Sequence, residues 1–289
     1  MKKIIIERLL VFFIGIPLIV CLVLFLPFFN NLALNIAAVI MSGLGAVELS
    51  SMLKKKQICV TKIESFILGI LAPLALTLNI CAGFPEWTVN VIIMSGAGLA
   101  LISGIFSRSA EIETVLNKTI GGFSLLVYPG FFMYWLIKMS VWENPGVILL
   151  FLSICFASDS FAWLFGTLFG AGNRGLIAVS PNKSIVGFIG GLIGSVIIAA
   201  LAAVIFPALF PVNESYTTSS LIFIAMIIGF CTGIAAMLGD LAESAIKRSC
   251  EVKDSGNMML GRGGILDSID SIVVAAPIFY MMYYLLFIV

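Results

Sequence analysis

The residues best suited to chemistry lie in one polar stretch near the C-terminal end, residues 239–271, with the sequence GDLAESAIKRSCEVKDSGNMMLGRGGILDSIDS. It carries six of the fifteen carboxylates and four of the sixteen Lys and Arg residues, whereas the sequence on either side of it is mostly apolar. Carboxylates gathered beside cations favour a site that binds a divalent metal ion and phosphate groups. We therefore expect this stretch to form the reacting face of the protein.

The spacing within this stretch groups its polar residues on helix faces. Four polar residues follow one another at helical spacing: Asp240, Glu243, Ser244 and Lys247. Asp267 and Asp270 are three residues apart, so both are expected on one face of a helix. Acidic residues at the start of a helix can also simply complement its dipole. That alternative accounts for one aspartate better than for the whole group.

Three further features are candidates for ligand binding. The glycines of the GRGG turn at 261–264 would let the backbone approach a ligand closely, although such a turn is weak evidence by itself. Asp159 lies in an apolar segment, where a carboxylate is costly unless it is paired, hydrated, metal-bound or able to reach the interface. Ser180 and Lys183, in the sequence SPNKS, offer a hydroxyl and a cation to a phosphate at a helix start. Ser-Pro-Asn is also an ordinary turn sequence.

The composition excludes several classes of protein. Of the 289 residues, 61% are hydrophobic and 11% are charged, against about 25% charged in a soluble domain. There is no histidine, which excludes histidine metal ligands and a histidine base. The six cysteines form no CxxC pair, so neither a zinc site nor a disulfide framework is indicated. The net charge of +1, without a basic tract, gives no indication of nucleic-acid binding.

Apolar segments long enough to cross a bilayer recur along the chain. The first lacks a small-residue cleavage site, which favours an uncleaved span over a signal peptide. With the N-terminus in the cytoplasm, fifteen of the sixteen Lys and Arg residues fall on the cytoplasmic side, and Lys138 falls outside. The nine segments are approximately 9–29, 32–52, 63–84, 87–106, 120–137, 146–170, 185–206, 221–238 and 271–289.

The sequence thus predicts an all-α integral membrane protein with about nine transmembrane helices, its N-terminus cytoplasmic and its C-terminus outside. Residues 1–144 are expected to supply about five N-terminal spans. Residues 145–289 are expected to form a catalytic transmembrane region with a cytoplasmic loop at 239–271. A multi-pass protein of the cell inner (plasma) membrane, with its active site facing the cytoplasm, is the corresponding expectation.

These motifs together resemble the phosphatidate cytidylyltransferase family, the CDP-diacylglycerol synthases. The family signature runs Ser-x-apolar-Lys-Arg, four residues, Lys-Asp-x-Gly, then a Gly-His-Gly-Gly turn and Asp-Arg-x-Asp. Asp240, Asp159 with the residues after it, and Ser180 with Lys183 resemble the neighbouring conserved blocks. Eleven positions over 27 residues match at the required spacing: Ser244, Lys247, Arg248, Lys253, Asp254, Gly256, Gly261, Gly263, Gly264, Asp267 and Asp270.

Several positions depart from the family pattern. Arg262 stands in place of the histidine of the glycine turn, and Ser268 in place of the arginine between the last two aspartates. Leu260, Asn182 and Val186 replace a proline, a lysine and a glutamate. Either Arg262 supplies the cation missing at position 268, or the changes mark a homologue with altered or lost activity.

The resemblance implies a reaction of CTP with phosphatidate that yields CDP-diacylglycerol and diphosphate, with Mg²⁺ and possibly a second cation as cofactors. Membrane lipid and a second copy of the chain, in a possible homodimer, are the other implied partners. The implied catalytic residues are Asp240, Asp267, Asp270 and Lys247, and the implied metal ligands are Asp240, Asp267, Asp270 and Asp159. The implied substrate-binding residues are Ser180, Lys183, Ser244, Arg248, Lys253, Asp254, Arg262, Gly263 and Gly264.

Three other functions are alternatives to this one. A CDP-alcohol phosphotransferase would need an Asp-x-x-Asp-Gly-x-x-Ala-Arg start, which does not occur in the sequence. A secondary transporter would place its acids near midplane and show an inverted repeat, whereas the acids here gather at one end of the spans. A non-catalytic or altered-substrate homologue that binds nucleotide or lipid stays open.

Overall fold

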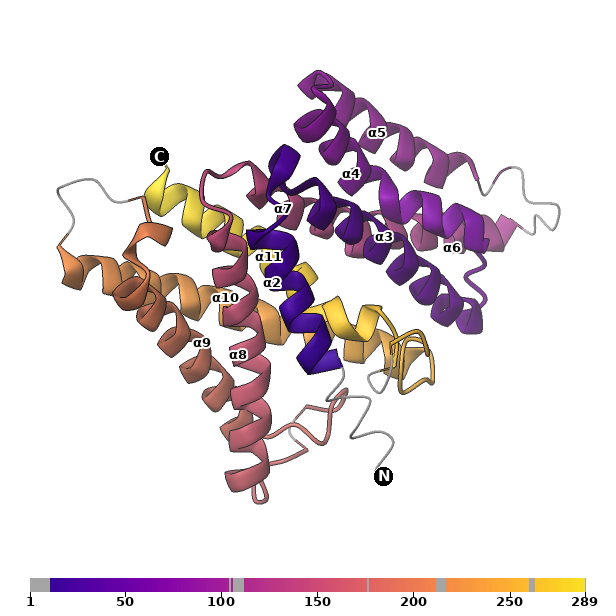
Figure 1. The fold of residues 1–289 in the computed structure, drawn as a ribbon. Helices are drawn as coiled ribbons and strands as arrows, with labels where there is room; N and C mark the ends of the chain where they lie inside the picture. The colour runs from indigo at the N-terminus through magenta and orange to yellow at the C-terminus, as the bar shows by residue number, and fades with distance from the viewer. Residues whose placement is uncertain are drawn as a thin grey trace. The chain divides into compact units, whose positions relative to one another are not determined.

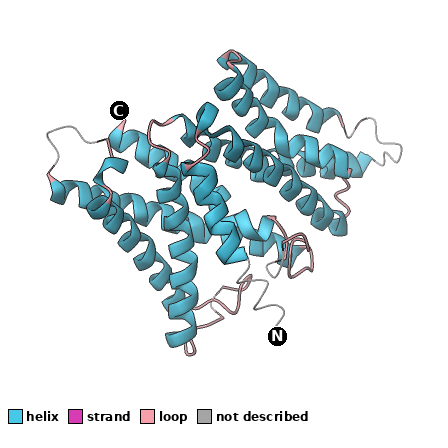
Figure 2. Cartoon of the chain, in the orientation of Figure 1, coloured by secondary structure: helices cyan, strands magenta, loops and turns pink. Residues whose placement is uncertain are grey.

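The computed structural model describes residues 11–103, 105, 112–175, 177–211, 217–259 and 263–288. Over these residues the chain consists of helices joined by loops and turns, without a strand (Figure 2). The prediction of an all-α protein is confirmed.

The chain divides into two compact units. The first comprises Met1–Val141 and Lys247–Ile269, and the second comprises Trp142–Ile246 and Asp270–Val289. Two long helices contribute to both units, because the last residues of α10 (Thr218–Ser249) and the first residues of α11 (Leu266–Phe287) belong to the first unit together with the loop between them. The functional division after residue 144 stays a prediction.

The first unit is built from the N-terminal helices (Figure 1). A π-helical turn, Leu126–Phe131, joins the last two of them into one apolar run. Pro129 lies in this turn and lacks a backbone N–H, so it favours the local departure from α-helical bonding. The helices are α2 (Ile16–Leu24), α3 (Phe28–Leu53), α4 (Lys62–Ala82), α5 (Glu86–Ile102), α6 (Ile112–Leu125) and α7 (Phe132–Lys138).

Polar side chains fix the helix starts and contacts of the first unit. α4 begins with the capping sequence T-x-x-E, in which the Thr61 hydroxyl accepts a hydrogen bond from the Glu64 backbone N–H at 3.2 Å. α3 packs against α4. The buried Ser42 hydroxyl on α3 lies 2.7 Å from the Gly69 carbonyl on α4 and 2.8 Å from the Pro129 carbonyl in the π-helical turn. It therefore connects three segments of the unit.

Glycines at the helix contacts of the second unit allow its helices to pack closely. α8 (Gly146–Phe169) and α9 (Ile185–Ile205) lie side by side (Figure 1). A Cβ added at Gly190 or Gly194 of α9 would lie 2.6 Å from a phenylalanine side chain on α8. A Cβ at Gly229 of α10 would lie 2.7 Å from the Ala199 Cβ on α9. Small residues let membrane helices approach closely, as these three do.

Seven of the described helices are long and apolar enough to cross a membrane. They are Phe28–Lys56, Lys62–Ala82, Val115–Val141, Gly146–Phe169, Ile185–Ile205, Thr218–Ser249 and Leu266–Phe287. Two shorter apolar helices, Phe13–Leu24 and Glu86–Ile102, overlap the remaining predicted segments. Each predicted segment thus overlaps an apolar helix among the described residues, and the chain is a multi-pass membrane protein. The number of nine spans stays a prediction.

The polar stretch near the C-terminal end is more helical than the predicted span boundaries suggest. α10 continues eleven residues beyond the predicted end at 238, to Ser249, and α11 begins at Leu266 rather than at 271. Asp240 and Lys247 therefore lie on α10, and Asp267 and Asp270 lie in the first turns of α11. The connecting loop shortens to residues 250–265.

Candidate active site

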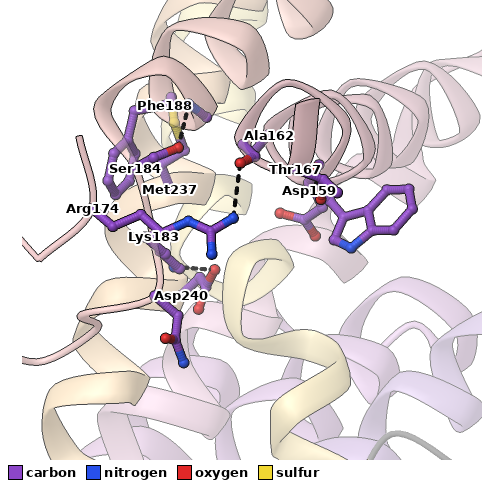
Figure 3. A pocket seen from close by; sticks show the side chains of 13 residues that line it. Asp159, Ala162, Thr167, Arg174, Lys183, Ser184, Phe188, Met237 and Asp240 are labelled. Atoms are coloured by element: carbon purple, nitrogen blue, oxygen red, sulfur yellow. Dashed lines mark hydrogen bonds and ion pairs between the residues drawn. The ribbon is translucent and has the colours of Figure 1, made fainter. Parts of the chain in front are cut away.

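A cavity of about 410 Å³ with both charged and apolar walls opens within the second unit (Figure 3). Its size lies within the range of about 300–1,000 Å³ that is usual for small-molecule sites. Four segments line it: the C-terminal half of α8, the connection from α8 to α9, the first turn of α9 and the middle of α10. The lining residues are Asp159, Ala162, Trp163, Gly166, Thr167, Arg174, Asn182, Lys183, Ser184, Gly187, Phe188, Met237 and Asp240.

The connection between α8 and α9 is folded back so that its cations reach the cavity. Arg174 and Ser184 form an isolated antiparallel bridge, and the Ile185 N–H donates to the Asn173 carbonyl at 3.3 Å. The Ser184 hydroxyl caps α9 by accepting from the Gly187 N–H at 3.0 Å. Lys183 therefore stands immediately before a capped helix start, as the SPNKS sequence predicts.

Two cations and two carboxylates face one another in this cavity. Lys183 forms an ion pair with Asp240, and both side chains are about one-third exposed. The Arg174 guanidinium donates from Nη2 to the Gly166 carbonyl at 3.2 Å. Figure 3 shows Arg174 and Lys183 extending into the same side of the cavity, with Asp159 on the α8 wall. The cavity thus offers positive charge to a phosphate and carboxylates to a metal ion.

Asp270 does not line the cavity but lies close to its acids within the second unit. The Ser271 hydroxyl donates to Asp159 Oδ2 at 3.2 Å, and the Ser271 N–H donates to Asp270 Oδ1 at 2.6 Å. Asp270 is buried, and it experiences the negative charges of Asp240, Glu243 and Asp159. These acids come from α8, α10 and α11. Asp159, Asp240 and Asp270 are the three among them that the family resemblance implies as metal ligands.

A glycine permits this approach of α10 to α11. A Cβ added at Gly239 would lie 2.5 Å from the Asp270 carbonyl oxygen. Ser244, one turn after Asp240 on α10, lies 3.5 Å from its Oδ1, at the limit of hydrogen bonding. Within the described ranges, no three Asp, Glu, Cys or His side chains are already arranged to hold a metal ion.

Asp267, in the first turn of α11 within the first unit, has different surroundings. Its Oδ1 forms an ion pair with Lys247 at 2.6 Å. Its Oδ2 accepts from the Ser255 N–H at 2.8 Å and the Gly264 N–H at 2.7 Å, with the Ser255 hydroxyl at 2.9 Å. Both carboxylate oxygens therefore organise the loop and the start of α11 in this structure.

The remaining predicted residues surround this loop. Gly263 has φ +103°, and a Cβ there would lie 2.6 Å from Asp267 Oδ2, so the position requires glycine. Three of them are exposed residues of the first unit: Arg248 at the end of α10, and Lys253 and Asp254 in the loop. Ser180 is half-buried in the α8–α9 connection, in a turn with Lys183. Arg262, with Gly261 and Leu260, lies outside the described residues.

An exposed ion pair also attaches this loop to the 3-10 turn Lys54–Lys56, which follows α3 in the first unit. Lys56 lies 2.7 Å from Glu251, and its ammonium holds the pKa of that carboxyl below its ordinary value of 4.5.

Ser268, at a position where the sequence departs from the expected signature, donates to the Gly264 carbonyl at 3.3 Å and helps to hold the glycine turn.

Two residues of these contacts are not singled out by motif or spacing. Arg174, a lining residue of the cavity, enters the sequence analysis only as one of the charges on the predicted cytoplasmic side. Its signal is its place in GAGNRG, a polar connection between two apolar segments. Glu48 is a buried carboxyl and the one charged residue of α3, and a lone charge in a predicted span is its signal in the sequence.

A helical membrane protein whose cavity gathers cations and carboxylates fits the class of membrane enzymes that handle phosphate groups. Residues 6–286 match the sequence profile of the cytidylyltransferase family. The chain belongs to this family and is a nucleotidyltransferase, as the signature residues predict.

Curated relatives agree with this assignment. The chain is 30% identical over 266 residues to the phosphatidate cytidylyltransferase of Staphylococcus haemolyticus, covering 90% of this chain and 94% of the relative. It is 30% identical over 297 residues to the protein of the same name in Haemophilus influenzae, covering 96% and 98%. It is 30% identical over 203 residues to that of Thermotoga maritima, covering 70% and 71%.

Proposed function

We propose that this protein is a phosphatidate cytidylyltransferase, which makes CDP-diacylglycerol from CTP and phosphatidate. A phosphate oxygen of phosphatidate forms a bond to the α-phosphorus of CTP. The bond from that phosphorus to the β-phosphate oxygen breaks, and diphosphate leaves. The observation that carries the proposal is the cavity of the second unit, where Arg174, Lys183, Asp159 and Asp240 gather in a chain of this family.

A lipid substrate fits the surroundings of this cavity. An apolar pocket of about 290 Å³ adjoins it and shares two of its wall residues, Phe188 and Met237. Its other lining residues are Ile177, Ile189, Leu192, Ile234, Leu238 and Leu241. A phosphate in the cavity would therefore leave apolar surface beside it for the remainder of a lipid.

The cations of the cavity act on the phosphates in this proposal. Phosphoryl transfer requires positioning and stabilisation of developing negative charge more than covalent participation by the protein. Lys183 exchanges its contact with Asp240 for a phosphate oxygen when substrate binds, and Arg174 provides a second contact. Ser180, Ser244, Arg248, Lys253, Asp254, Arg262, Gly263 and Gly264 are the further proposed substrate contacts.

The acids of the second unit suit Mg²⁺, because their oxygens are the ligands that this ion prefers. Asp159, Asp240 and Asp270 would hold it, and when bound it would stabilise the charge that develops on the phosphates. Asp267, with Lys247, is proposed as a further catalytic and metal-site residue. Since both of its oxygens already accept hydrogen bonds or an ion pair, taking part would require it to release Lys247 or a loop donor.

The finer membrane arrangement belongs to the same proposal. Nine spans, with the two shorter apolar helices included, a cytoplasmic N-terminus and an outer C-terminus are supported by the distribution of Lys and Arg. This arrangement would place the active site at the cytoplasmic side of the inner membrane, with access to cytosolic CTP. A homodimer is a further proposal that follows from the resemblance.

The test uses purified protein in detergent with phosphatidate and CTP labelled at the α-phosphorus. We expect the label to enter the lipid with Mg²⁺, to stop when EDTA is added, and to resume when Mg²⁺ is restored. Asp240→Asn and Asp267→Ala are expected to lose most turnover. CTP binding without transfer of label would contradict the proposal and favour the non-catalytic homologue.

A further inference from the structure

Glu48 is a buried carboxyl that the reaction chemistry described so far does not use. It lies on α3 in the first unit, and 5% of its surface is exposed. Its Oε2 accepts a hydrogen bond from the Leu266 N–H at 2.9 Å and lies 3.2 Å from the Ser255 hydroxyl. A carboxyl buried in an apolar helix is costly unless its partners compensate. Ser255 belongs to the loop that leads into α11, and Leu266 is the first residue of that helix.

The loop is shaped around this carboxyl group. A Cβ added at Gly256 would collide with Glu48 Oε1, and one added at Gly264 would collide with Glu48 Oε2 and the Ser255 hydroxyl. These two glycines therefore let the loop backbone lie directly against Glu48. For Gly264, this contact is a structural reason for glycine that is separate from the approach of a ligand.

Ser255 connects Glu48 to the Asp267 carboxylate. Its hydroxyl oxygen lies 3.2 Å from Glu48 Oε2 and 2.9 Å from Asp267 Oδ2, and it accepts from the Asp267 N–H at 3.2 Å. Its backbone N–H donates to the same Asp267 oxygen at 2.8 Å. Any displacement of Ser255 therefore moves two donors relative to Asp267, the residue paired with Lys247.

We propose that Glu48 is a positioning residue for the transfer reaction: through Ser255 and the Leu266 N–H it holds the loop that fixes Asp267 and Lys247. This inference rests on the proposed function, in which Asp267 and Lys247 take part. Glu48 lies more than 200 positions from the loop in the sequence, so this contact makes an N-terminal helix part of the site's support.

The test compares Glu48→Leu, which has similar volume but no acceptor, with Glu48→Gln, which retains one. The glutamine carbonyl can take the place of Oε2. Its amide nitrogen would take the place of Oε1, which has no hydrogen-bond partner among the described residues. We expect Glu48→Leu to lower kcat by about 10–100-fold, the usual loss when an orienting partner is removed, with little change in KM for CTP. Glu48→Gln should restore most of kcat.

Ser42→Ala is the matched control, because it removes a buried hydrogen bond from the same helix without contacting the loop. It should lower Tm and leave kcat near that of the wild type. Adding Ser255→Ala to Glu48→Leu should reduce kcat by less than about twofold more, since coupled residues are not additive. Full additivity of the two losses, or normal kcat in Glu48→Leu, would overturn the proposal.

Hydrogen exchange provides a measurement that does not depend on turnover. Peptides covering residues 252–266 should exchange faster in Glu48→Leu than in wild type, Glu48→Gln or Ser42→Ala. Unchanged exchange there would overturn the positioning role. A wild-type protein without transfer activity would instead refute the proposed function, and the exchange result would still decide whether Glu48 holds the loop.

Discussion

Replacing Lys183 by methionine separates the contribution of this side chain to catalysis from its contribution to folding stability. The ion pair of Lys183 with Asp240 is partly solvated, since the two side chains are 28% and 33% exposed. A pair of this kind contributes at most about 1 kcal/mol to folding stability. A hydrogen bond from a cation to a phosphate contributes about 1.5–3 kcal/mol, which corresponds to roughly a 10–150-fold change in rate or affinity. The loss of activity should therefore greatly exceed the loss of stability.

The assay is transfer of label from CTP to phosphatidate, measured at several concentrations of each substrate and compared with thermal unfolding. Lys56→Met is the control. It also removes the lysine of a lysine–carboxylate ion pair, that with Glu251, but at an exposed position outside the cavity. We expect Lys183→Met to lose at least about tenfold in kcat/KM with a small change in Tm, and Lys56→Met to keep its activity. Wild-type kcat/KM in Lys183→Met would refute the assignment of Lys183 to substrate phosphate.

Three further predictions concern other parts of the chain. Arg174→Gln should raise KM for CTP or phosphatidate by about tenfold, and unchanged KM values for both would remove Arg174 from the site. Gly190→Ala should destabilise the protein by about 1–3 kcal/mol, because the new Cβ would lie 2.6 Å from a phenylalanine side chain. Gly98→Ala, whose Cβ would have no atom within 4 Å, should not destabilise it. Equal Tm values for the two variants would contradict the packing argument. Lys56 lowers the pKa of Glu251 from its ordinary value of 4.5. The pair should therefore stabilise the fold above pH 4.5 and lose this effect as the pH falls through the lowered pKa. A Tm difference between wild type and Glu251→Gln that persists in stronger acid would contradict this.

The sequence predicted the apolar helices and several members of the site because their signals are local. Helical spacing placed Asp240 and Lys247 on one helix and Asp267 with Asp270 on another, and the structure has both helices. The SPNKS sequence predicted the turn that brings Lys183 to a helix start. The span boundaries were less accurate, since a hydropathy pattern ends where charges begin, whereas α10 continues to Ser249.

What the sequence could not provide were contacts between distant residues. Glu48 lies against Ser255 and Leu266 through tertiary packing of the first unit, and no local periodicity indicates that contact. The pairing of Lys183 with Asp240 likewise depends on how the α8–α9 connection folds back. Asp267 was predicted as a metal ligand, but its hydrogen bonds to Ser255 and Gly264 could not be inferred from spacing.

The most direct test of the central claim asks whether transfer takes place in the cavity of the second unit. Ala162→Phe would place a ring in that cavity, and Leu168→Phe, at an exposed position of the same helix, is its control. Wild type and Leu168→Phe should move the α-phosphorus label of CTP into lipid, and Ala162→Phe should do so at least about tenfold more slowly, because small displacements of reactants are costly. Wild-type rates in Ala162→Phe would place the reaction elsewhere, and no labelled lipid from the wild-type protein would contradict the proposed function itself.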